Sequence, residues 1–464
     1  MTDRSAAVAE LTAALPEGVV ATRPEALEKY RFDWAKDPEA GMPCAAVRAE
    51  SAEHVQVAVR WAASHGIPVV PRGAGSGLSG GASAVEGGLV VSLERMTAIE
   101  IDPAARCAVV EPGAFNADVK RAAGEHGLWY PPDPSSFEIC SIGGNVATNA
   151  GGLCCVKYGV TTDYVLGLDV VLADGRLVTL GGKRIKDVAG LSLLKLFVGS
   201  EGTLGIVTRA TLRLVPAQLA PSTLVATFDT VRASADAVVA MGRVVRASMV
   251  ELMDKPTVNQ VEDFAPMGLD RDRALLLVQS DAPEGAREQE MAVIEKACVD
   301  AGAVDVFVTH DPAEGESFVR ARRLAFPAAE AAGSLLLEDV GVPVPQLPEL
   351  VARVEQIGVE RGVDIVCVAH AGDGNTHPIV MYDAADADST TRARAAFEDI
   401  LAAAIALGGT ITGEHGVGRL KRDALPAMLG PDVMELNQRI KTALDPDGLL
   451  NPGAVLPVIP AGQR

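Results

Sequence analysis

Short apolar runs, broken by glycines and Asp-Gly pairs, dominate the chain from about residue 40 to 218. Runs of this length between turn residues are typical of β-strands. A longer stretch before them, Ser51–His65, reads as a helix. The pattern predicts strands at Ile67–Val70, Leu89–Leu93, Ala108–Val110, Gly167–Leu172 and Gly205–Val207.

The pattern changes near residue 219, where helical periodicity begins to alternate with strands. The expected strands are Leu224–Phe228 and Ala274–Gln279, and the expected helices are Arg287–Ala301, Leu347–Arg361, Thr390–Leu407 and Val433–Leu444. A chain of 464 residues is too long for one core. We therefore expect a domain at 1–218, an α+β domain at 219–410, and a segment at 411–464 that packs back on the first domain.

Composition narrows the classes of function. The chain has 41 Lys and Arg against 61 Asp and Glu, a net charge of −20, so a nucleic-acid partner is not expected. No uncharged apolar run reaches the roughly 18 residues of a membrane helix, and the first 26 residues lack a signal-peptide pattern. The seven cysteines form no C-x-x-C pair, which favours free thiols and a cytoplasmic location.

A glycine-rich loop, Pro71–Gly81, follows the predicted strand at Ile67–Val70. Its Gly75–Gly80 portion matches G-x-G-x-x-G, but a Rossmann fold requires a helix directly afterwards. Here more glycines and another strand follow, and glycine disfavours a helix. The loop is either an anion-binding nest of backbone N–H groups or a plain surface loop.

Two further segments are rich in small residues and backbone donors. The first is Pro131–Ser136 leading into Ser141–Gly152, and the second is Gly199–Val207. Three such segments in one chain favour a single long ligand that is held mainly by backbone amides. A dinucleotide with a flat ring system fits this better than a mononucleotide does.

These three segments resemble the FAD-binding domain of the vanillyl-alcohol oxidase / p-cresol methylhydroxylase (VAO/PCMH) superfamily, over about residues 40–218. The resemblance implies that the first loop binds the pyrophosphate and the other two line the flavin. Since the first loop has no His, non-covalent FAD is expected. The implied cofactor-binding residues are Pro71, Arg72, Gly73, Ala74, Gly75, Ser76, Gly77, Leu78, Pro132, Asp133, Ser136, Gly143, Gly144, Asn145, Thr148, Gly151, Gly152, Glu201, Gly205, Ile206, Val207 and Asn451.

A histidine pair flanks a predicted hairpin late in the chain. Asp373 and Gly374 between two apolar runs are typical of a two-residue β-turn. In that register His370 faces His377 on one side of the hairpin, with Cβ atoms about 4.5–5.5 Å apart. The pair then either shares a metal ion, the interpretation that we favour, or is a polar pair at a strand end.

A third histidine lies in the glycine-rich turn Gly413–Gly418, next to Glu414. Glu414 would complete a His₂Glu ligand set with positions open for substrate. Neighbouring side chains of an extended segment point apart, so His415 would have a different task, that of a base. The alternative is an exposed Glu-His pair at a helix entry.

The His370–His377 segment and the Glu-His-Gly turn resemble the C-terminal domain of FAD-linked D-2-hydroxy-acid dehydrogenases, which include D-lactate, glycolate and D-2-hydroxyglutarate dehydrogenases. With the FAD segments, the resemblance covers nearly the whole chain. It implies a VAO/PCMH-type FAD-binding domain, an α+β substrate (cap) domain and a helical C-terminal segment. It also implies zinc or manganese bound by His370, His377 and Glu414.

The implied reaction removes a proton and a hydride from a small 2-hydroxy acid and yields the 2-keto acid. The metal polarises the hydroxyl, His415 takes the proton, and the hydride passes to flavin N5. His370 and His377 also contact the substrate. Of the arginines in Phe318–Arg323, the resemblance assigns Arg322 to the substrate carboxylate, against the alternative of a basic helix face.

Two positions bear on the substrate. Phe326 and Leu337 stand where hydroxyglutarate-specific relatives carry a hydroxyl and a Lys. This favours lactate-like or other monocarboxylate substrates. D-2-hydroxyglutarate dehydrogenase and a glycolate oxidase subunit are the alternatives.

Other readings stay open. One is another FAD-linked alcohol oxidase, or an ether-lipid-synthase-like transferase, on the same fold. A non-catalytic flavin-binding subunit should lack the His pair and Glu-His, which this chain keeps. A quinone, a cytochrome, an electron-transfer flavoprotein or an iron–sulfur subunit could accept the electrons, and no cysteine cluster indicates an iron–sulfur centre within this chain. A homodimer is one possibility for the assembly.

Overall fold

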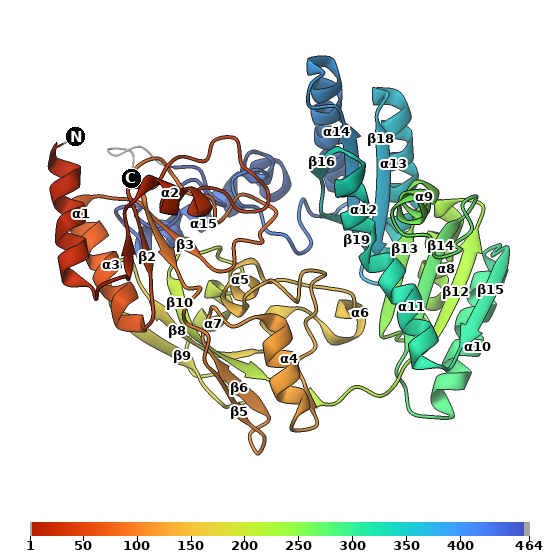
Figure 1. The fold of residues 1–464 in the computed structure, drawn as a ribbon. Coiled ribbons are helices and arrows are strands. Elements are labelled where there is room, and N and C mark those ends of the chain that lie inside the picture. The colour runs from red at the N-terminus through yellow and green to blue at the C-terminus, as the bar shows by residue number, and fades with distance from the viewer. Residues whose placement is uncertain (1, 459–464) are drawn as a thin grey trace. The chain divides into compact units, whose positions relative to one another are not determined.

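The computed structural model describes residues 2–458 and divides the chain into two compact units (Figure 1). The first unit comprises Met1–Gly151, Val160–Ala217 and Glu414–Arg464, and the second comprises Gly152–Gly159 and Gln218–Gly413. Both units mix helices and sheets, so the expected α+β class is confirmed. None of the helices in residues 2–458 is long and apolar enough to span a membrane.

A small mixed sheet opens the first unit, in the order β1-β2-β4-β3. The pairs β2–β4 and β3–β4 are parallel, and β1–β2 is antiparallel. The strands are β1 (Val20–Ala21), β2 (Ala45–Arg48), β3 (Val69–Arg72) and β4 (Leu89–Ser92). Helix α3 (Ala52–His65) packs against this sheet, with α1 (Thr2–Ala14) beside it. Ser51 caps α3 by accepting a hydrogen bond from His54 N–H.

A second sheet of the first unit is antiparallel throughout, in the order β5-β6-β10-β8-β9. Its strands are β5 (Ile99–Asp102), β6 (Cys107–Val110), β10 (Ile206–Arg213), β8 (Val165–Val171) and β9 (Leu177–Gly181). Buried and more exposed residues alternate along β10, which indicates that one face of this sheet packs inward.

Short elements and one long helix complete the first unit. Helix α15 (Leu425–Leu444) is kinked at Gly430, whose φ is 75°, directly before Pro431. The predicted helix Val433–Leu444 is the part after this kink. The other elements are α2 (Pro24–Leu27), η1 (Glu28–Tyr30), α4 (Asn116–Gly124), β7 (Leu128–Trp129), α5 (Ile142–Thr148), η2 (Thr161–Asp163), α7 (Leu193–Phe197), β11 (Val215–Pro216) and η4 (Arg422–Ala424).

The second unit is built on one antiparallel sheet, in the order β15-β12-β14-β13-β18-β19-β16, with β17 paired to β19. Its strands are β12 (Ser222–Phe228), β13 (Met249–Met253), β14 (Ala274–Ser280), β15 (Asp305–Thr309), β16 (Ser334–Leu337), β17 (Val340–Gly341), β18 (Asp364–His370) and β19 (Asn375–Tyr382). Central β13 is buried along its whole length. Functional residues on these strands are therefore held by a rigid scaffold.

Helices flank this sheet. Helix α13 packs against α8 and α14, and α9 packs against α12. The helices are α6 (Cys155–Tyr158), α8 (Val231–Met241), α9 (Lys255–Phe264), α10 (Ala286–Asp300), α11 (Pro312–Arg323), α12 (Ala325–Ala332), α13 (Leu347–Arg361) and α14 (Ala387–Ala406), with the short η3 (Val344–Gln346). The prediction for Leu347–Arg361 matches α13 at both ends.

The predicted register of the histidine hairpin is wrong by two residues. His370 lies opposite Asn375, and His377 lies opposite Val368. The turn is wider than expected because the Gly374 carbonyl accepts a hydrogen bond from Val342 N–H, and Gly374 has a φ of 84°. A shift of two residues keeps both histidines on the same face of the hairpin, since side chains alternate with period two.

Candidate active site

The first glycine loop runs on from β3 in the first unit. The carbonyls of Gly75 and Gly77 accept hydrogen bonds from Trp34 N–H and Ala35 N–H at 3.1 and 3.2 Å. The N–H groups of Gly75, Ser76 and Gly77 donate to no group among residues 2–458. Such a row of unused backbone donors fits the oxygens of a diphosphate.

Arg72 supports this loop. A Cβ on Gly75, whose φ is 76°, would collide with Nη2 of Arg72, so the guanidinium packs directly against the loop. Its Nη1 donates to the Ala82 carbonyl at 3.2 Å. Burial lowers the pKa of Arg72, while the nearby Asp33 carboxylate acts to raise it.

The structure brings the three predicted FAD segments of the first unit together. Ser141 Oγ accepts hydrogen bonds from Ala74 N–H in the first segment and from Gly144 N–H in its own. The third segment joins through Glu201 N–H, which donates to the Ala147 carbonyl at 2.8 Å. A Cβ on Gly202 would collide with the Pro71 ring. One continuous region of small residues therefore forms, as a single long ligand requires.

The individual residues fall on few elements. In the first segment, β3 ends with Pro71 and Arg72, and the loop after it is Gly73–Leu78. In the second segment, the loop after β7 contains Pro132, Asp133 and Ser136, helix α5 contains Gly143, Gly144, Asn145 and Thr148, and the residues after α5 include Gly151 and Gly152. In the third segment, β10 is preceded by Glu201 and Gly205 and begins with Ile206 and Val207. Asn451 comes from the C-terminal segment. Its Nδ2 donates to the carbonyls of Gly81 and Glu201 at 2.8 and 2.7 Å.

The histidine pair lies in the second unit. His370 ends β18, His377 lies in β19, and both are buried. Their ring centroids are 5.0 Å apart, with an interplanar angle of 85°. Two imidazoles at this separation can bind one metal ion between them.

Glu251 on β13 contacts both His370 and Arg322. Its Oε1 lies 2.7 Å from His370 Nδ1, and its Oε2 lies 2.8 Å from Arg322 Nε. When the neutral imidazole donates to this carboxylate from Nδ1, its Nε2 carries the lone pair that a metal ligand needs. The geometry therefore fits a metal at His370, with Glu251 as the outer carboxylate.

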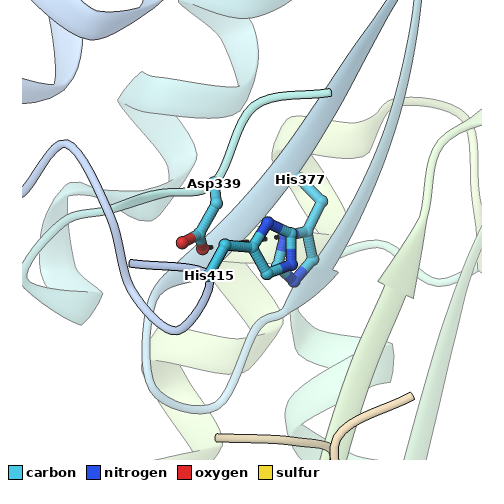
Figure 2. Close-up of side chains that lie close together, drawn as sticks. All are labelled: Asp339, His377 and His415. Atoms are coloured by element: carbon cyan, nitrogen blue, oxygen red, sulfur yellow. Dashed lines mark ion pairs between the residues drawn. The ribbon is translucent and has the colours of Figure 1, made fainter. Parts of the chain in front are cut away.

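A second buried carboxylate, Asp339, lies near His377. Its Oδ1 lies 3.7 Å from His377 Nδ1 (Figure 2), and the side chain is fully buried. Its Oδ2 accepts hydrogen bonds from Thr412 Oγ1 at 2.6 Å and Gly413 N–H at 2.9 Å. Asp339 thus ties the histidine pair to the stretch of chain that ends in Gly413.

Glu414 and His415 are the first two residues of the last segment of the first unit. Within that segment, His415 Nε2 lies 3.8 Å from Glu414 Oε1. Glu414 is bonded to Gly413, so its Cα is about 3.8 Å from that of Gly413. Their roles as ligand and base are developed below as proposals.

Arg322 is the buried arginine of the last turn of α11. It is 5% exposed, and its Nη2 has no hydrogen-bond partner among residues 2–458. Arg320 is exposed, and Arg323 pairs with Glu316 at 3.0 Å. A buried guanidinium nitrogen that lacks a partner is suited to bind a carboxylate.

The two positions that bear on the substrate lie in one apolar cluster. Phe326 and Leu337 pack with Leu335 and Met381 against a buried set of Ala329, Val366 and Ile379. Leu337 stands opposite Ile379 across β16 and β19. Apolar side chains therefore occupy this face of the second unit.

The sequence analysis missed Glu251 and the neighbouring Asp254. Asp254 accepts hydrogen bonds from Thr257 N–H and Cys367 N–H, both at 2.8 Å, and burial raises its pKa to about 7. The available signal was the acidic pair in and after the apolar strand Met249–Met253. A carboxylate in such a strand must have specific partners, because burying it alone is costly.

Two family models match the chain. The model described as "FAD binding domain" matches residues 43–181, and "FAD linked oxidases, C-terminal domain" matches residues 220–455. The glycolate oxidase subunit GlcD of Bacillus subtilis (strain 168) is 41% identical over 429 residues, or 91% of each chain. A D-lactate dehydrogenase of Archaeoglobus fulgidus is 35% identical over 440 residues, or 92% of this chain and 96% of the relative.

Solved structures show the same fold. A p-cresol methylhydroxylase with substrate bound matches with a TM-score of 0.82 at 19% identity, over 98% of each chain. A 4-ethylphenol oxidase from Gulosibacter chungangensis matches with a TM-score of 0.81 at 19% identity, over 100% of this chain and 99% of the other. The expected VAO/PCMH-type fold is thereby confirmed.

Proposed function

Because the chain belongs to the family of FAD-linked oxidases, we propose that it oxidises a D-2-hydroxy monocarboxylic acid to the 2-keto acid. The relatives named glycolate oxidase subunit and D-lactate dehydrogenase support this substrate class. The observation that carries the proposal is the buried carboxylate of Glu251. It contacts both His370, the proposed metal ligand, and the buried Arg322.

FAD fits the first unit. Three segments of small residues meet there, and the N–H groups of Gly75, Ser76 and Gly77 are available to phosphate oxygens. The first loop offers no histidine for a covalent bond, so the cofactor would be held non-covalently. When bound, FAD supplies the acceptor for the substrate hydride.

A divalent metal fits the second unit. We assign its binding to His370 and His377, with Glu414 as the third ligand because it directly follows the anchored Gly413. Zinc and manganese both accept imidazole and carboxylate ligands, and either would supply Lewis-acid polarisation of the substrate hydroxyl. Glu251 orients the His370 imidazole, and the Asp339 carboxylate lies near that of His377.

The other side chains position the substrate and move its proton. Arg322 binds the substrate carboxylate through Nη2 and so fixes the orientation of Cα–H. His415 accepts the hydroxyl proton, a task that suits an imidazole near neutral pH. Since Glu251 holds Arg322 and His370 together, the carboxylate and the hydroxyl of the substrate are placed by one rigid group.

The apolar cluster supports a monocarboxylate. Phe326, Leu335, Leu337 and Met381 all pack against one buried set of Ala329, Val366 and Ile379. A second carboxylate placed against these apolar side chains would lose part of its hydration. D-Lactate or a longer apolar 2-hydroxy acid therefore fits better than D-2-hydroxyglutarate.

The reduced flavin must pass its electrons on. The relative named a glycolate oxidase subunit supports transfer to a partner protein. A quinone, a cytochrome, an electron-transfer flavoprotein and an iron–sulfur subunit are the candidate acceptors.

Anaerobic flavin bleaching tests the proposal. The FAD-loaded chain is mixed with D- and L-lactate, glycolate, D-2-hydroxyglutarate and 4-ethylphenol, with and without a chelator, while the flavin absorbance is followed. We expect rapid bleaching by D-lactate or another D-monocarboxylate. The chelator should abolish it, and added zinc or manganese should restore it.

Variants and substrates separate the outcomes. His415→Gln should slow bleaching by about a hundredfold or more, because a positioned base contributes that much. The control His126→Gln changes an exposed histidine and should leave the rate unchanged. Bleaching by 4-ethylphenol alone would instead indicate an alcohol or phenol oxidase on the same fold. If a hydroxy acid bleached the flavin equally fast with and without the chelator, the reaction would not require a metal.

A further inference from the structure

The turn that carries His415 is held by the side chain of Glu201, all within the first unit. Oε1 of Glu201 accepts a hydrogen bond from Val417 N–H at 2.7 Å, and Oε2 accepts one from Gly418 N–H at 2.9 Å. The Glu201 side chain is buried. Both of its oxygens are thus bonded to the backbone two and three residues after His415.

Ser79 holds the same turn from a second side. Its Oγ donates to the His415 carbonyl at 3.1 Å. Its own carbonyl accepts hydrogen bonds from Arg419 N–H and Leu420 N–H at 3.0 and 3.2 Å. Ser79 lies in the first glycine-rich loop and directly follows Leu78, the last residue of that loop that is predicted to bind FAD.

The glycines of the turn permit this close packing. Gly416 has a φ of 87°, and a Cβ there would lie 2.8 Å from Oε1 of Glu201. Gly418 has a φ of 53°, and a Cβ there would collide with the Ser79 carbonyl. Positive φ together with missing space explains why glycine stands at both positions.

The inference from these contacts rests on the role of His415 in the proposed function. We propose that Glu201, helped by Ser79, is a positioning residue that sets the backbone of the His415 turn. Because both residues lie in or next to predicted FAD segments, the flavin and the proton-accepting imidazole would be aligned by the same backbone. The Glu201 carboxylate would act on the turn and not on the cofactor.

The substitution Glu201→Gln tests this with little change in volume. Burial raises the pKa of Glu201 to about 7, and the hydrogen bonds from Val417 and Gly418 oppose this rise. Gln keeps one acceptor oxygen and replaces the other by an NH₂ group, which cannot accept from a backbone N–H. One of the two bonds to the turn is therefore lost.

The matched control is Glu262→Gln. Glu262 is also a buried carboxylate, and its Oε1 accepts hydrogen bonds from Met267 N–H and Leu269 N–H, both at 2.9 Å. It stabilises a loop of the second unit and has no part in the proposed reaction. Both variants are prepared as FAD-loaded full chains, together with Ser79→Ala.

Two measurements are made on each variant. Hydrogen exchange is followed in the peptides that cover residues 414–420 and 265–270, and steady-state kinetics give kcat and KM for the acid that bleaches the flavin. For Glu201→Gln we expect faster exchange at 414–420 and a kcat lower by about tenfold to a hundredfold, with KM nearly unchanged. Ser79→Ala should change both readouts in the same direction. Glu262→Gln keeps the one oxygen that accepts both N–H groups, so it should leave exchange at 265–270 and at 414–420 unchanged and keep kcat.

Other results overturn the proposal. Unchanged exchange at 414–420 in Glu201→Gln would show that the carboxylate does not hold the turn, and faster exchange with wild-type kcat would show that the turn needs no holding. Loss of FAD from that variant would assign the carboxylate to the cofactor. Failure of the proposed function is seen separately: His415→Gln would then keep full turnover, while hydrogen exchange still decides whether Glu201 holds the turn.

Discussion

Glu251 Oε1 lies 2.7 Å from His370 Nδ1, and this contact joins the candidate metal site to the candidate substrate site. The second oxygen of the same carboxylate contacts Arg322 Nε at 2.8 Å. The side chains of all three residues are at most 5% exposed. One buried anion therefore offsets a guanidinium and orients an imidazole.

The substitution Glu251→Gln should weaken both functions. Metal affinity should fall by about tenfold to a hundredfold, because an outer-shell carboxylate orients its histidine ligand. Stability should fall by about 3–5 kcal/mol, because Arg322 would stay buried without its partner charge. Zinc titration of the metal-free protein against a competing chelator, and thermal unfolding, measure the two effects.

Glu262→Gln is again the control, since it removes a buried carboxylate of the same unit that contacts no histidine. It should keep the zinc affinity of the wild type. Equal zinc affinity in Glu251→Gln and wild type would remove Glu251 from the metal site.

The helices were predictable where local signals agree. For α13, Leu347–Arg361, apolar periodicity fills the interior and Gly362 ends the helix with a φ of 62°. The hairpin register was not predictable, because it depends on Val342, which donates to the Gly374 carbonyl from more than 30 residues away. A turn signal fixes local geometry, whereas a contact from a distant segment can widen the turn.

The candidate site shows the same division. His370, His377 and Arg322 can be proposed from the sequence, because each lies in a motif of residues close together in the chain. Glu251 could not be found from a motif, because its partners His370 and Arg322 are both distant from it in sequence, His370 by 119 residues. Only the fold brings the three side chains together. The grouping of Glu201 with the His415 turn was missed for the same reason, since 216 positions separate it from Val417.

The FAD loop can be tested with Gly75→Ala. Gly75 has a φ of 76°, which strains any other residue, and a Cβ there would collide with the Arg72 guanidinium, so either the loop or this guanidinium must shift. We expect the purified variant to hold less FAD, with affinity lower by about tenfold or more. The ratio of flavin to protein absorbance and a titration of the cofactor-free chain measure this.

Gly190→Ala separates strain from position. Gly190 has a φ of 81°, but no atom lies within 4 Å of the added Cβ, so this variant carries the backbone strain alone. It should keep the FAD affinity of the wild type. If both variants lost FAD equally, the loop Pro71–Leu78 would have no special part in cofactor binding.

Asp254 predicts a pH dependence of stability. Burial raises its pKa from 3.8 to about 7 in the folded chain. Between these values the folded state binds more protons than the unfolded state, so stability is lost as pH rises from about 4 through 7. The slope from this group is at most about 1.4 kcal/mol per pH unit.

The substitution Asp254→Asn should remove that slope. The variant should be less stable than the wild type at pH 5, because it loses an acceptor for Thr257 or Cys367. The gap should narrow as pH rises to 8. Thermal midpoints across this range measure it, with Asp364→Asn, an exposed carboxylate, as the variant that should follow the wild type. A gap that stays constant with pH would show that Asp254 is ionised throughout.

The substrate class can be tested at Leu337. Its side chain packs against the buried Ala329, Val366 and Ile379, as do those of Phe326, Leu335 and Met381. Leu337→Lys places an ammonium group where the distal carboxylate of a dicarboxylic acid would lie. We expect the ratio of kcat/KM for D-2-hydroxyglutarate to kcat/KM for D-lactate to rise by about tenfold or more, because a charge-assisted contact replaces an unfavourable apolar one.

Leu336→Lys supplies the matched control for this change. Leu336 is the preceding residue of β16, so its side chain points to the opposite face of the sheet. It adds the same charge to the same strand without adding it to the cluster. An equal rise in both variants would reflect general electrostatic attraction of the dianion, and no rise in Leu337→Lys would place the substrate chain elsewhere. Only a rise confined to Leu337→Lys assigns the cluster of Phe326, Leu335, Leu337 and Met381 as the wall that selects monocarboxylates.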